Sequence, residues 1–317
     1  MSTDIQQTQS QLQAAKERVS RVAIGTVGTL LAVKVVAAVL TGSIGLLADA
    51  VHSLIDLTGA IIGFLGVRVA GKPPDEKHSF GHGRAEDIAG ATIATLIFIA
   101  AGIIAYEAIQ RLMEGATVQM LEAGIFATAI VIAINMSVAR YVLVFAKTTD
   151  SVALEATGRD LMADVMSSIA VLVGLVLVRA TGQPLLDPLV ALIVVVLIVR
   201  TASGTMRKAV SNLMDTRLPE HEEDAIRAAV EGRKDIANYH ALRTRKAGNQ
   251  RHVQLHIIVP RERTVEEGHR VAEDVEDEIR ALFPGSAVTV HVEPCTPDCA
   301  ECPTPCENPR GQGEPRQ

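Results

Sequence analysis

Long apolar runs occupy the first two thirds of the chain, whereas shorter alternating runs occupy the last third. Six of the long runs approach the roughly 20 apolar residues that a membrane-spanning helix requires. They cover residues 22–40, 44–70, 89–108, 121–145, 153–178 and 185–199. The pattern predicts a multi-pass α-helical membrane protein, with six transmembrane helices in residues 21–210.

Lysine and arginine are concentrated at one set of ends of these runs. The opposite ends carry mainly Arg111 and Arg179. The concentrated set comprises Lys16, Arg18, Arg21, Arg68, Lys72, Lys77, Arg84, Arg140, Lys147, Arg200, Arg207 and Lys208. By the positive-inside rule these ends face the cytoplasm, and six crossings then place both termini there. Residues 1–20 are polar and lack a secretory signal, which is typical of a cytoplasmic N-terminal segment.

The composition changes after Arg200, and residues 211–294 have the pattern of a small soluble α+β domain. Thr264 and Glu267 form a capping-box pattern at the start of a helix. A Gly248-Asn249 turn between two alternating runs predicts a β-hairpin. The expected elements are a helix at 219–234, strands at 240–244 and 252–259, a helix from 264 to about 282, and a strand at 287–292.

Composition supports a membrane protein and excludes nucleic acid as a partner. Of the 317 residues, 48% are hydrophobic and 21% are charged, and the mean hydropathy is +0.27. The 30 Lys and Arg residues against 36 Asp and Glu residues give a net charge of −6. A basic surface for DNA or RNA is therefore not expected.

All four cysteines lie near the C-terminus, in the segment PCTPDCAECPTPC. Thiolates at this spacing fit a four-cysteine metal site, a redox cluster or a scavenger of soft metals. A structural zinc site and a flexible metal-sensing tail both remain open for Cys295, Cys299, Cys302 and Cys306. Residues 295–317 are rich in proline, glycine and charge, which predicts a flexible tail.

Two of the apolar runs carry ionisable residues at mid-span, where a charge costs at least about 2.5 kcal/mol. His52 and Asp56 are four positions apart in the second run, and Asp160 and Asp164 are four apart in the fifth. Residues four apart share one face of a helix. At a rise of about 1.5 Å per residue, both pairs lie near the centre of a hydrocarbon core about 30 Å thick. One imidazole and three carboxylates at one depth predict a site for a divalent first-row metal.

Other interpretations stay open around these pairs. Asp49 lies nearer the outer end of the second run, where a helix cap, a place on the exit path and metal ligation all fit. Lys34, in the first run, either neutralises a carboxylate or extends its ammonium to the membrane surface. The pairs themselves could be buried polar groups satisfied by neighbouring helices, although their matched spacing and depth favour a metal site.

Histidines also cluster outside the apolar runs. The loop KPPDEKHSFGHGRAED contains Asp75, His78 and His82, and on pattern alone it fits a metal site or a hydrated basic loop. His221 and His252 are assigned to solvent. The soluble domain holds five candidate ligands: His240, His256, His269, His291 and Glu293.

The sequence resembles the cation diffusion facilitators, a family of proton-coupled exporters of divalent metals. The resemblance covers nearly the whole chain and is carried by GSIGLLADAVHSLIDLTGA, HSFGHGRAE, DLMAD and DTRLPEHE. It implies a homodimer whose subunits each have six membrane helices and a metallochaperone-like (ferredoxin-like) cytoplasmic domain for dimerisation and metal sensing. It also implies that His52, Asp56, Asp160 and Asp164 form the transport site.

The same resemblance implies two further metal sites. Asp75, His78 and His82 match a loop site of the family. Metal between the cytoplasmic domains would be held by His240, His256, His269, His291 and Glu293.

Many zinc exporters of the family place histidine first in both membrane pairs, whereas this chain has Asp160 in the second pair. Zinc, iron(II) and manganese are therefore all candidate substrates.

The expected function is proton-coupled efflux of a divalent cation from the cytoplasm by alternating access around the His/Asp site. Metal binding needs a neutral imidazole and ionised carboxylates, so it displaces protons. Metal ions are expected as substrates and regulatory ligands, with no catalytic cofactor and no enzymatic activity. The expected setting is the lipid bilayer of a bacterial inner membrane. The alternatives are a non-transporting metal sensor or partner subunit, and a membrane metalloenzyme.

Overall fold

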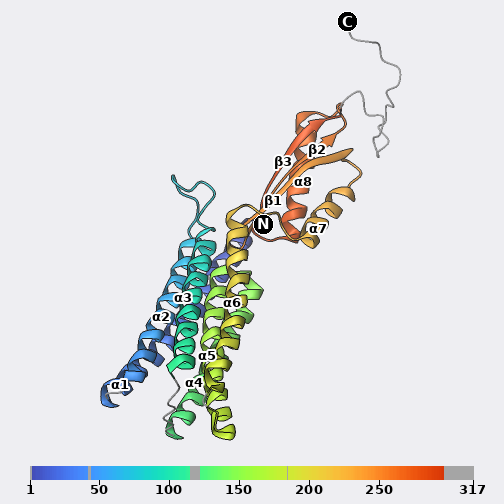
Figure 1. The fold of residues 1–317 in the computed structure, drawn as a ribbon. Helices are drawn as coiled ribbons and strands as arrows, with labels where there is room; N and C mark the ends of the chain where they lie inside the picture. Colours follow the sequence, from blue (N-terminus) through green and yellow to red (C-terminus); the bar gives the residue numbers. More distant parts are fainter. Residues whose placement is uncertain (1, 42–43, 115–121, 184, 296–317) are drawn as a thin grey trace. The chain divides into compact units, whose positions relative to one another are not determined.

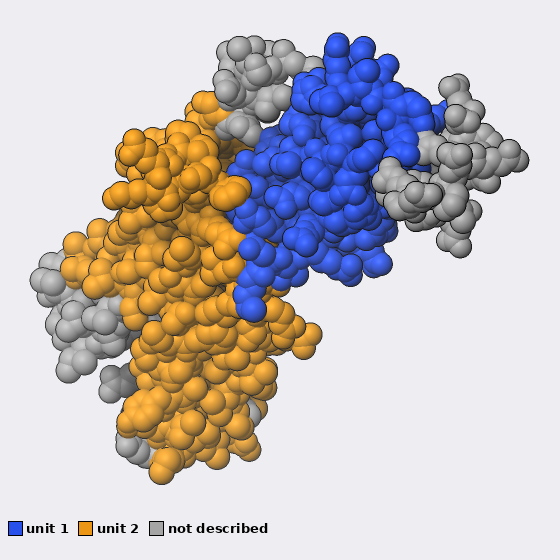
Figure 2. All heavy atoms as spheres, turned by 90° about the horizontal axis from the view of Figure 1, so that it is seen from above, with its two compact units in different colours: residues 1–6, 214–317 blue, residues 7–213 orange. Residues whose placement is uncertain are grey.

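The computed structural model describes residues 2–41, 44–114, 122–183 and 185–295. Six long helices are followed by a small α+β part (Figure 1). Contacts divide the chain into two compact units, coloured separately in Figure 2. One unit contains Gln7–Leu213, and the other contains Met1–Gln6 with Met214–Gln317.

The long helices follow the apolar runs of the sequence. They are α1 (Ser2–Thr41), α2 (Ile44–Ala70), α3 (Ala85–Glu114), α4 (Glu122–Thr149), α5 (Val152–Thr181) and α6 (Leu186–Leu213). Within the described residues, four segments are long and apolar enough to cross a membrane: Ser53–Ala70, Ala85–Met113, Ile130–Thr149 and Pro188–Leu213. A helical membrane region is thereby confirmed, whereas the count of six crossings stays a prediction.

The helices of the larger unit pack through small and branched side chains. Helix α3 packs along α6 and α5, α4 along α5, and α2 along α3 and α5. A Cβ atom added at Gly66 of α2 would lie 2.4 Å from the Cβ of Ala89 on α3, so only glycine permits this approach. One buried cluster joins α3, α5 and α6: Ile93, Ile97, Ala101, Ala156, Ile198 and Ala202.

The polar N-terminal segment is helical. Helix α1 begins at Ser2, about twenty residues before the first apolar run. Its glutamine, alanine and lysine residues have high helix propensity. Gln13 donates from Nε2 to the backbone oxygen of Val67 at 2.7 Å, and Lys16 is 1% exposed. The helix is therefore held by contacts with α2 and α3 as well as by local propensity.

The α+β part confirms the predicted fold of the last third. Strands β1 and β2 are antiparallel, and β3 runs parallel to β2, which gives a three-stranded sheet of order β1-β2-β3. Thr264 accepts a hydrogen bond from the backbone N–H of Glu267 in a complete capping box. The elements are α7 (Glu220–Glu231), β1 (Asn238–Ala247), β2 (Gln250–Val259), α8 (Val265–Leu282) and β3 (Ala287–Pro294).

The core of this part comes from one face of the sheet and two helices. Val253, Leu255, Ile257 and Val259 alternate along β2 into a cluster with the apolar side of α8. Gly248, at the β1–β2 turn, has a φ of +60°, a conformation that favours glycine. The opposite face of the sheet is left for polar side chains.

Candidate functional site

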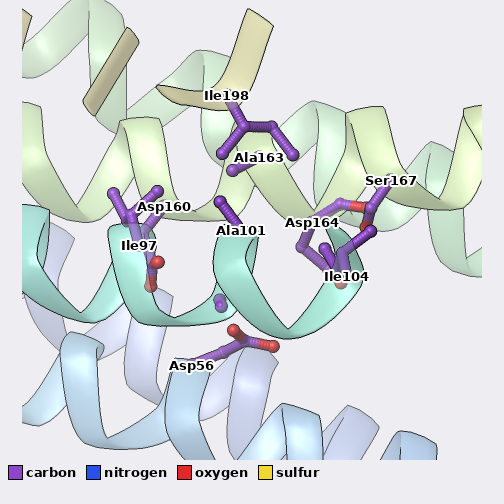
Figure 3. Close-up of a pocket in the computed structure, with 10 residues that line it drawn as sticks. Asp56, Ile97, Ala101, Ile104, Asp160, Ala163, Asp164, Ser167 and Ile198 are labelled. Atoms are coloured by element: carbon purple, nitrogen blue, oxygen red, sulfur yellow. The ribbon is translucent and has the colours of Figure 1, made fainter. Parts of the chain in front are cut away.

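Three carboxylates meet in one pocket of the helical unit. Asp160 and Asp164 project from α5 and Asp56 from α2, and all three line the pocket shown in Figure 3. The walls are otherwise largely apolar and come from α3, α5 and α6: Ile97, Ala100, Ala101, Ile104, Ala163, Ser167 and Ile198. Carboxylates inside apolar helices are costly unless cations or protons accompany them. The pocket therefore has the chemistry of a cation site.

Close packing of α2 on α5 positions one of these carboxylates. A Cβ atom added at Gly59 would lie 2.9 Å from Oδ2 of Asp160. The absence of a side chain at Gly59 therefore leaves the space that the carboxylate occupies.

The predicted fourth ligand, His52, lies on α2 one turn before Asp56. Its side chain falls outside the described residues, as do the side chains of Asp49 and Lys34. Among the described residues, the carboxylate oxygens of these three aspartates do not come within 4.8 Å of one another as a set. A cation bound there would need side-chain movement or further ligands, and the four-residue transport site stays a prediction.

Asn135 is a polar neighbour of this site that the sequence interpretation missed. It lies on α4, is 5% exposed, and donates from Nδ2 to Oδ2 of Asp164 at 2.5 Å. Together with Ser53, Asp56 and Asp164 it lines a second pocket. The signal that could have found it is a carboxamide in the middle of an otherwise apolar span.

The loop between α2 and α3 brings its three predicted ligands together. Nδ1 of His78 lies 3.2 Å from Oδ1 of Asp75, and Nε2 of His82 lies 3.3 Å from Oδ2 of Asp75. One ligand atom from each residue falls within 4.8 Å of the other two. The three side chains can therefore approach a single metal ion with little rearrangement.

The backbone of this loop stabilises the charged form of Asp75. The amide N–H groups of Lys77 and His78 donate to Oδ1 of Asp75 at 2.9 and 2.7 Å. The hydrogen bond from His78 is the main cause that holds the pKa of Asp75 below its usual value. The carboxylate is thus ionised, as a metal ligand must be.

Three histidines form a row across the polar face of the sheet. The strand register places His240 opposite His256 and His256 opposite His291. Their rings are neighbours, with centroids 5.1 Å apart for His240 and His256, and 4.7 Å apart for His256 and His291. A β-bulge after His240, with Ala241 at a φ of +51°, interrupts β1 at this row.

Glu293 connects the row. Its carboxylate oxygens lie 2.8 Å from Nδ1 of His256 and 3.5 Å from Nε2 of His240. These three residues form the second compact group of candidate ligands among the described residues. His291 lies 3.8 Å from the same carboxylate. His269, on α8, is exposed and lies 3.3 Å from Glu273 instead, so the structure does not bring it into this group.

The assignment of His252 to solvent is wrong. His252 is 8% exposed, because β2 is the central strand and Arg245 and Ala287 flank it on the two neighbouring strands. His221, on α7, is exposed.

The cysteine-rich segment is described at its first cysteine. Cys295 is buried, and its N–H donates to the backbone oxygen of Val259 at 2.9 Å, which extends the β2–β3 pairing. Cys299, Cys302 and Cys306 lie outside the described residues. A metal site of the four cysteines stays a prediction.

Comparison with known proteins matches both units. Residues 20–214 match the family described as cation efflux transmembrane domain, and residues 218–295 match the cytoplasmic domain of cation efflux proteins. An uncharacterised transporter of Synechocystis sp. is 36% identical over 86% of this chain and 88% of its own length. The cation-efflux pump FieF is 33% identical in Pectobacterium atrosepticum, over 80% of this chain and 84% of the pump. The FieF pump of Salmonella typhi is 32% identical, over 88% of this chain and 93% of the pump.

Proposed function

The chain belongs to the cation diffusion facilitator (cation efflux) family of membrane transporters, and from this premise we propose that it exports divalent transition-metal cations from the cytoplasm in exchange for protons. The observation that carries the proposal is the pocket lined by Asp56, Asp160 and Asp164 within apolar helices. Three carboxylates in such a pocket suit a doubly charged cation. His52, one turn from Asp56, completes the proposed set of ligands.

Proton coupling follows from the chemistry of these ligands. Carboxylates and an imidazole bind metal only after they lose their protons. Metal binding from the cytoplasm therefore releases protons, and protons that enter from the outer side favour release of the metal. The four proposed ligand positions thus serve as both metal and proton carriers in alternating access. Zinc, iron(II) and manganese are the proposed substrates.

The proposed setting is a homodimer in a bacterial inner membrane, with both termini in the cytoplasm. The bacterial relatives support the choice of membrane, and the distribution of lysine and arginine supports the orientation of the termini. The two groups of candidate ligands, at Asp75 and at Glu293, are proposed as cytoplasmic regulatory sites. Metal that binds more tightly to one arrangement of the dimer increases the population of that arrangement. The Cys-rich tail adds a proposed metal-sensing segment.

The transport proposal is tested by metal flux in vesicles that contain the full-length purified protein. We expect zinc, iron(II), manganese, cobalt or cadmium to drive counter-movement of protons in wild type. Asp56→Ala and Asp160→Ala should abolish this flux and keep a folded dimer, because each change removes a ligand from a polar pocket. Ser167→Ala, at the same pocket, is the matched control and should keep the flux. Normal flux in either aspartate variant contradicts the site.

The regulatory proposal has its own test. His256→Ala should shift the metal concentration at which transport is half-maximal, because the His240, His256 and Glu293 group loses its central imidazole. His221→Ala removes an exposed histidine from the same domain and should have no effect. A protein that binds metal at the clusters but moves none across the membrane would instead be a metal sensor.

A further inference from the structure

Asn135 contacts the intramembrane site from a third helix. Its Nδ2 lies 2.5 Å from Oδ2 of Asp164, and the side chain is 5% exposed. A carboxylate accepts hydrogen bonds and does not donate them, so the amide nitrogen must face Asp164. This requirement fixes the orientation of the carboxamide and turns its oxygen away from Asp164.

Among the described residues, that oxygen has no hydrogen-bond partner. Oδ1 of Asn135 is buried and makes no hydrogen bond within the part of the chain that the structure describes. Buried polar atoms in folded proteins nearly always have a partner. The unpartnered oxygen sits on a side chain that lines the pocket shared by Asp56 and Asp164. An acceptor in this position marks a place where a cation or its bound water would be held.

Resting on the proposed transport function, we propose that Asn135 is a specificity-determining residue of the transport site. Its amide oxygen is a neutral ligand of the transported cation, directly or through one water molecule. Its amide nitrogen holds the Asp164 carboxylate in place beside the cation. The hydrogen bond thus links α4 to the ligand pair of α5.

A neutral oxygen ligand has a consequence for the substrate. Carboxylate and carbonyl oxygens suit hard divalent cations such as manganese, whereas imidazole suits zinc. Asn135 therefore favours manganese as cargo beside zinc. A residue that only joined α4 to α5 would have no such effect.

The test uses full-length protein and cobalt(II), whose visible absorption reports the number and type of its ligands. The signal of the intramembrane site is the part of the spectrum that Asp160→Ala removes. Asn135→Leu keeps the shape of the side chain but removes both polar atoms. We expect it to raise the cobalt dissociation constant of this site by about tenfold or more, the range found when supporting ligands are lost, and to change the spectrum. Asn135→Asp keeps an oxygen and should recover part of the lost affinity.

Asn212→Ala is the matched control. Asn212 makes the same kind of bond, from Nδ2 to Oδ1 of Asp87 at 2.8 Å, but lies outside the residues that line the two pockets. It should leave the cobalt affinity and spectrum unchanged. Asn135→Ala replaces Asn135→Leu if the leucine variant does not fold. If neither folds, Asn135→Asp must change the zinc-to-manganese flux ratio.

The outcomes separate this inference from the transport proposal. If Asn135→Leu has the cobalt spectrum and cobalt affinity of wild type, the proposed role of Asn135 is wrong. Metal flux in wild type would still support the transport proposal. If Asn135→Asp binds cobalt as weakly as Asn135→Leu does, the amide oxygen is not a ligand of the cation. An unchanged flux ratio in Asn135→Asp overturns the effect on specificity. Failure of the transport proposal is distinct, because wild type would then move no metal.

Discussion

The ammonium group of Lys16 lies 2.8 Å from Oε1 of Glu86, and both side chains are 1% exposed. Glu86 is in the first turn of α3, and its Oε2 accepts a hydrogen bond from Ser151, which directly precedes α5. This buried group ties α1, α3 and α5 together. A charge buried in this way needs its partner, because the low dielectric makes an unpaired charge costly.

We predict that Lys16→Met lowers the free energy of unfolding of the helical unit by about 3–5 kcal/mol, the usual cost of removing one member of a buried ion pair. Denaturant unfolding of the purified protein in detergent measures the change. Arg21→Ala is the control, since Arg21 pairs with Glu17 at 3.9 Å on an exposed surface. It should cost less than about 1 kcal/mol.

A double variant tests the cause of this loss. Lys16→Met with Glu86→Leu removes both charges and should be more stable than the two single changes predict by addition. Additive losses would show that Lys16 and Glu86 stabilise the helices independently of each other.

Changing either of two glycines of α2 to alanine is predicted to affect different properties of the protein: transport for one glycine and stability for the other. At Gly59 the new methyl would press on the end of the Asp160 side chain, which can rotate away. At Gly66 it would press on the Cβ of Ala89 at 2.4 Å and on the backbone oxygen of Ala85 at 3.2 Å, which cannot. Gly59→Ala should therefore impair transport and keep the fold, whereas Gly66→Ala should lower the melting temperature.

Metal flux and thermal unfolding, measured on the same preparations, separate the two effects. A Gly59→Ala protein with wild-type flux would mean that Asp160 works equally well after displacement. A Gly66→Ala protein with an unchanged melting temperature would mean that α2 and α3 can move apart at little cost.

The capping box of α8 gives a pH-dependent prediction. The backbone N–H of Thr264 donates to Glu267 at 2.8 Å, and this bond is the main cause that lowers the pKa of Glu267 below its usual value of 4.5. A carboxylate with a lowered pKa stabilises the fold above its unfolded-state pKa and loses this effect as the pH falls through the folded-state pKa. The cap should therefore be intact at pH 6 and be lost progressively as the pH falls below 4.5, through the lowered pKa of Glu267.

Hydrogen exchange of the first turn of α8, measured by mass spectrometry on the full chain, reports the cap. Glu267→Gln should exchange faster than wild type at pH 6, and the difference should shrink as the pH falls below 4.5, the usual pKa. Glu266→Gln, the neighbouring exposed glutamate, should behave as wild type. A constant difference at all pH values would show that charge on Glu267 is unimportant.

The sequence was most informative where local signals act alone. Thr264 and Glu267 predicted the start of α8, and the alternation of Val253, Leu255 and Ile257 predicted β2, because capping and burial on one face depend on neighbouring residues. The row of His240, His256 and His291 could not be derived from the local pattern, since it depends on the register of three strands.

Contacts between distant residues explain what the pattern missed. The sequence pattern places Lys16 in a polar cytoplasmic segment, but its burial depends on Glu86, which lies 70 positions away. Asn135 is one carboxamide in an apolar span, and its proximity to Asp164 follows from how α4 packs on α5. His252 is buried because strands flank it on both sides, which hydropathy along the chain does not record.

Ligand identity at Asp160 carries the last prediction, which concerns selectivity. Replacing it with histidine exchanges a hard anionic oxygen for an imidazole nitrogen, a ligand that suits zinc more than manganese. Zinc binds more tightly than manganese or iron(II) at almost any such site, so the relative flux is the informative quantity. We expect Asp160→His to raise the zinc-to-manganese and zinc-to-iron(II) flux ratios several-fold in vesicles under matched pH gradients.

Ser167→Ala is the control and should leave both ratios unchanged. Ser167 lines the same pocket, but its Oγ donates to the backbone oxygen of Asp164 at 2.9 Å. Equal ratios in wild type and Asp160→His would place the determinant of selectivity elsewhere, and a shift in Asn135→Asp alone would place it on α4.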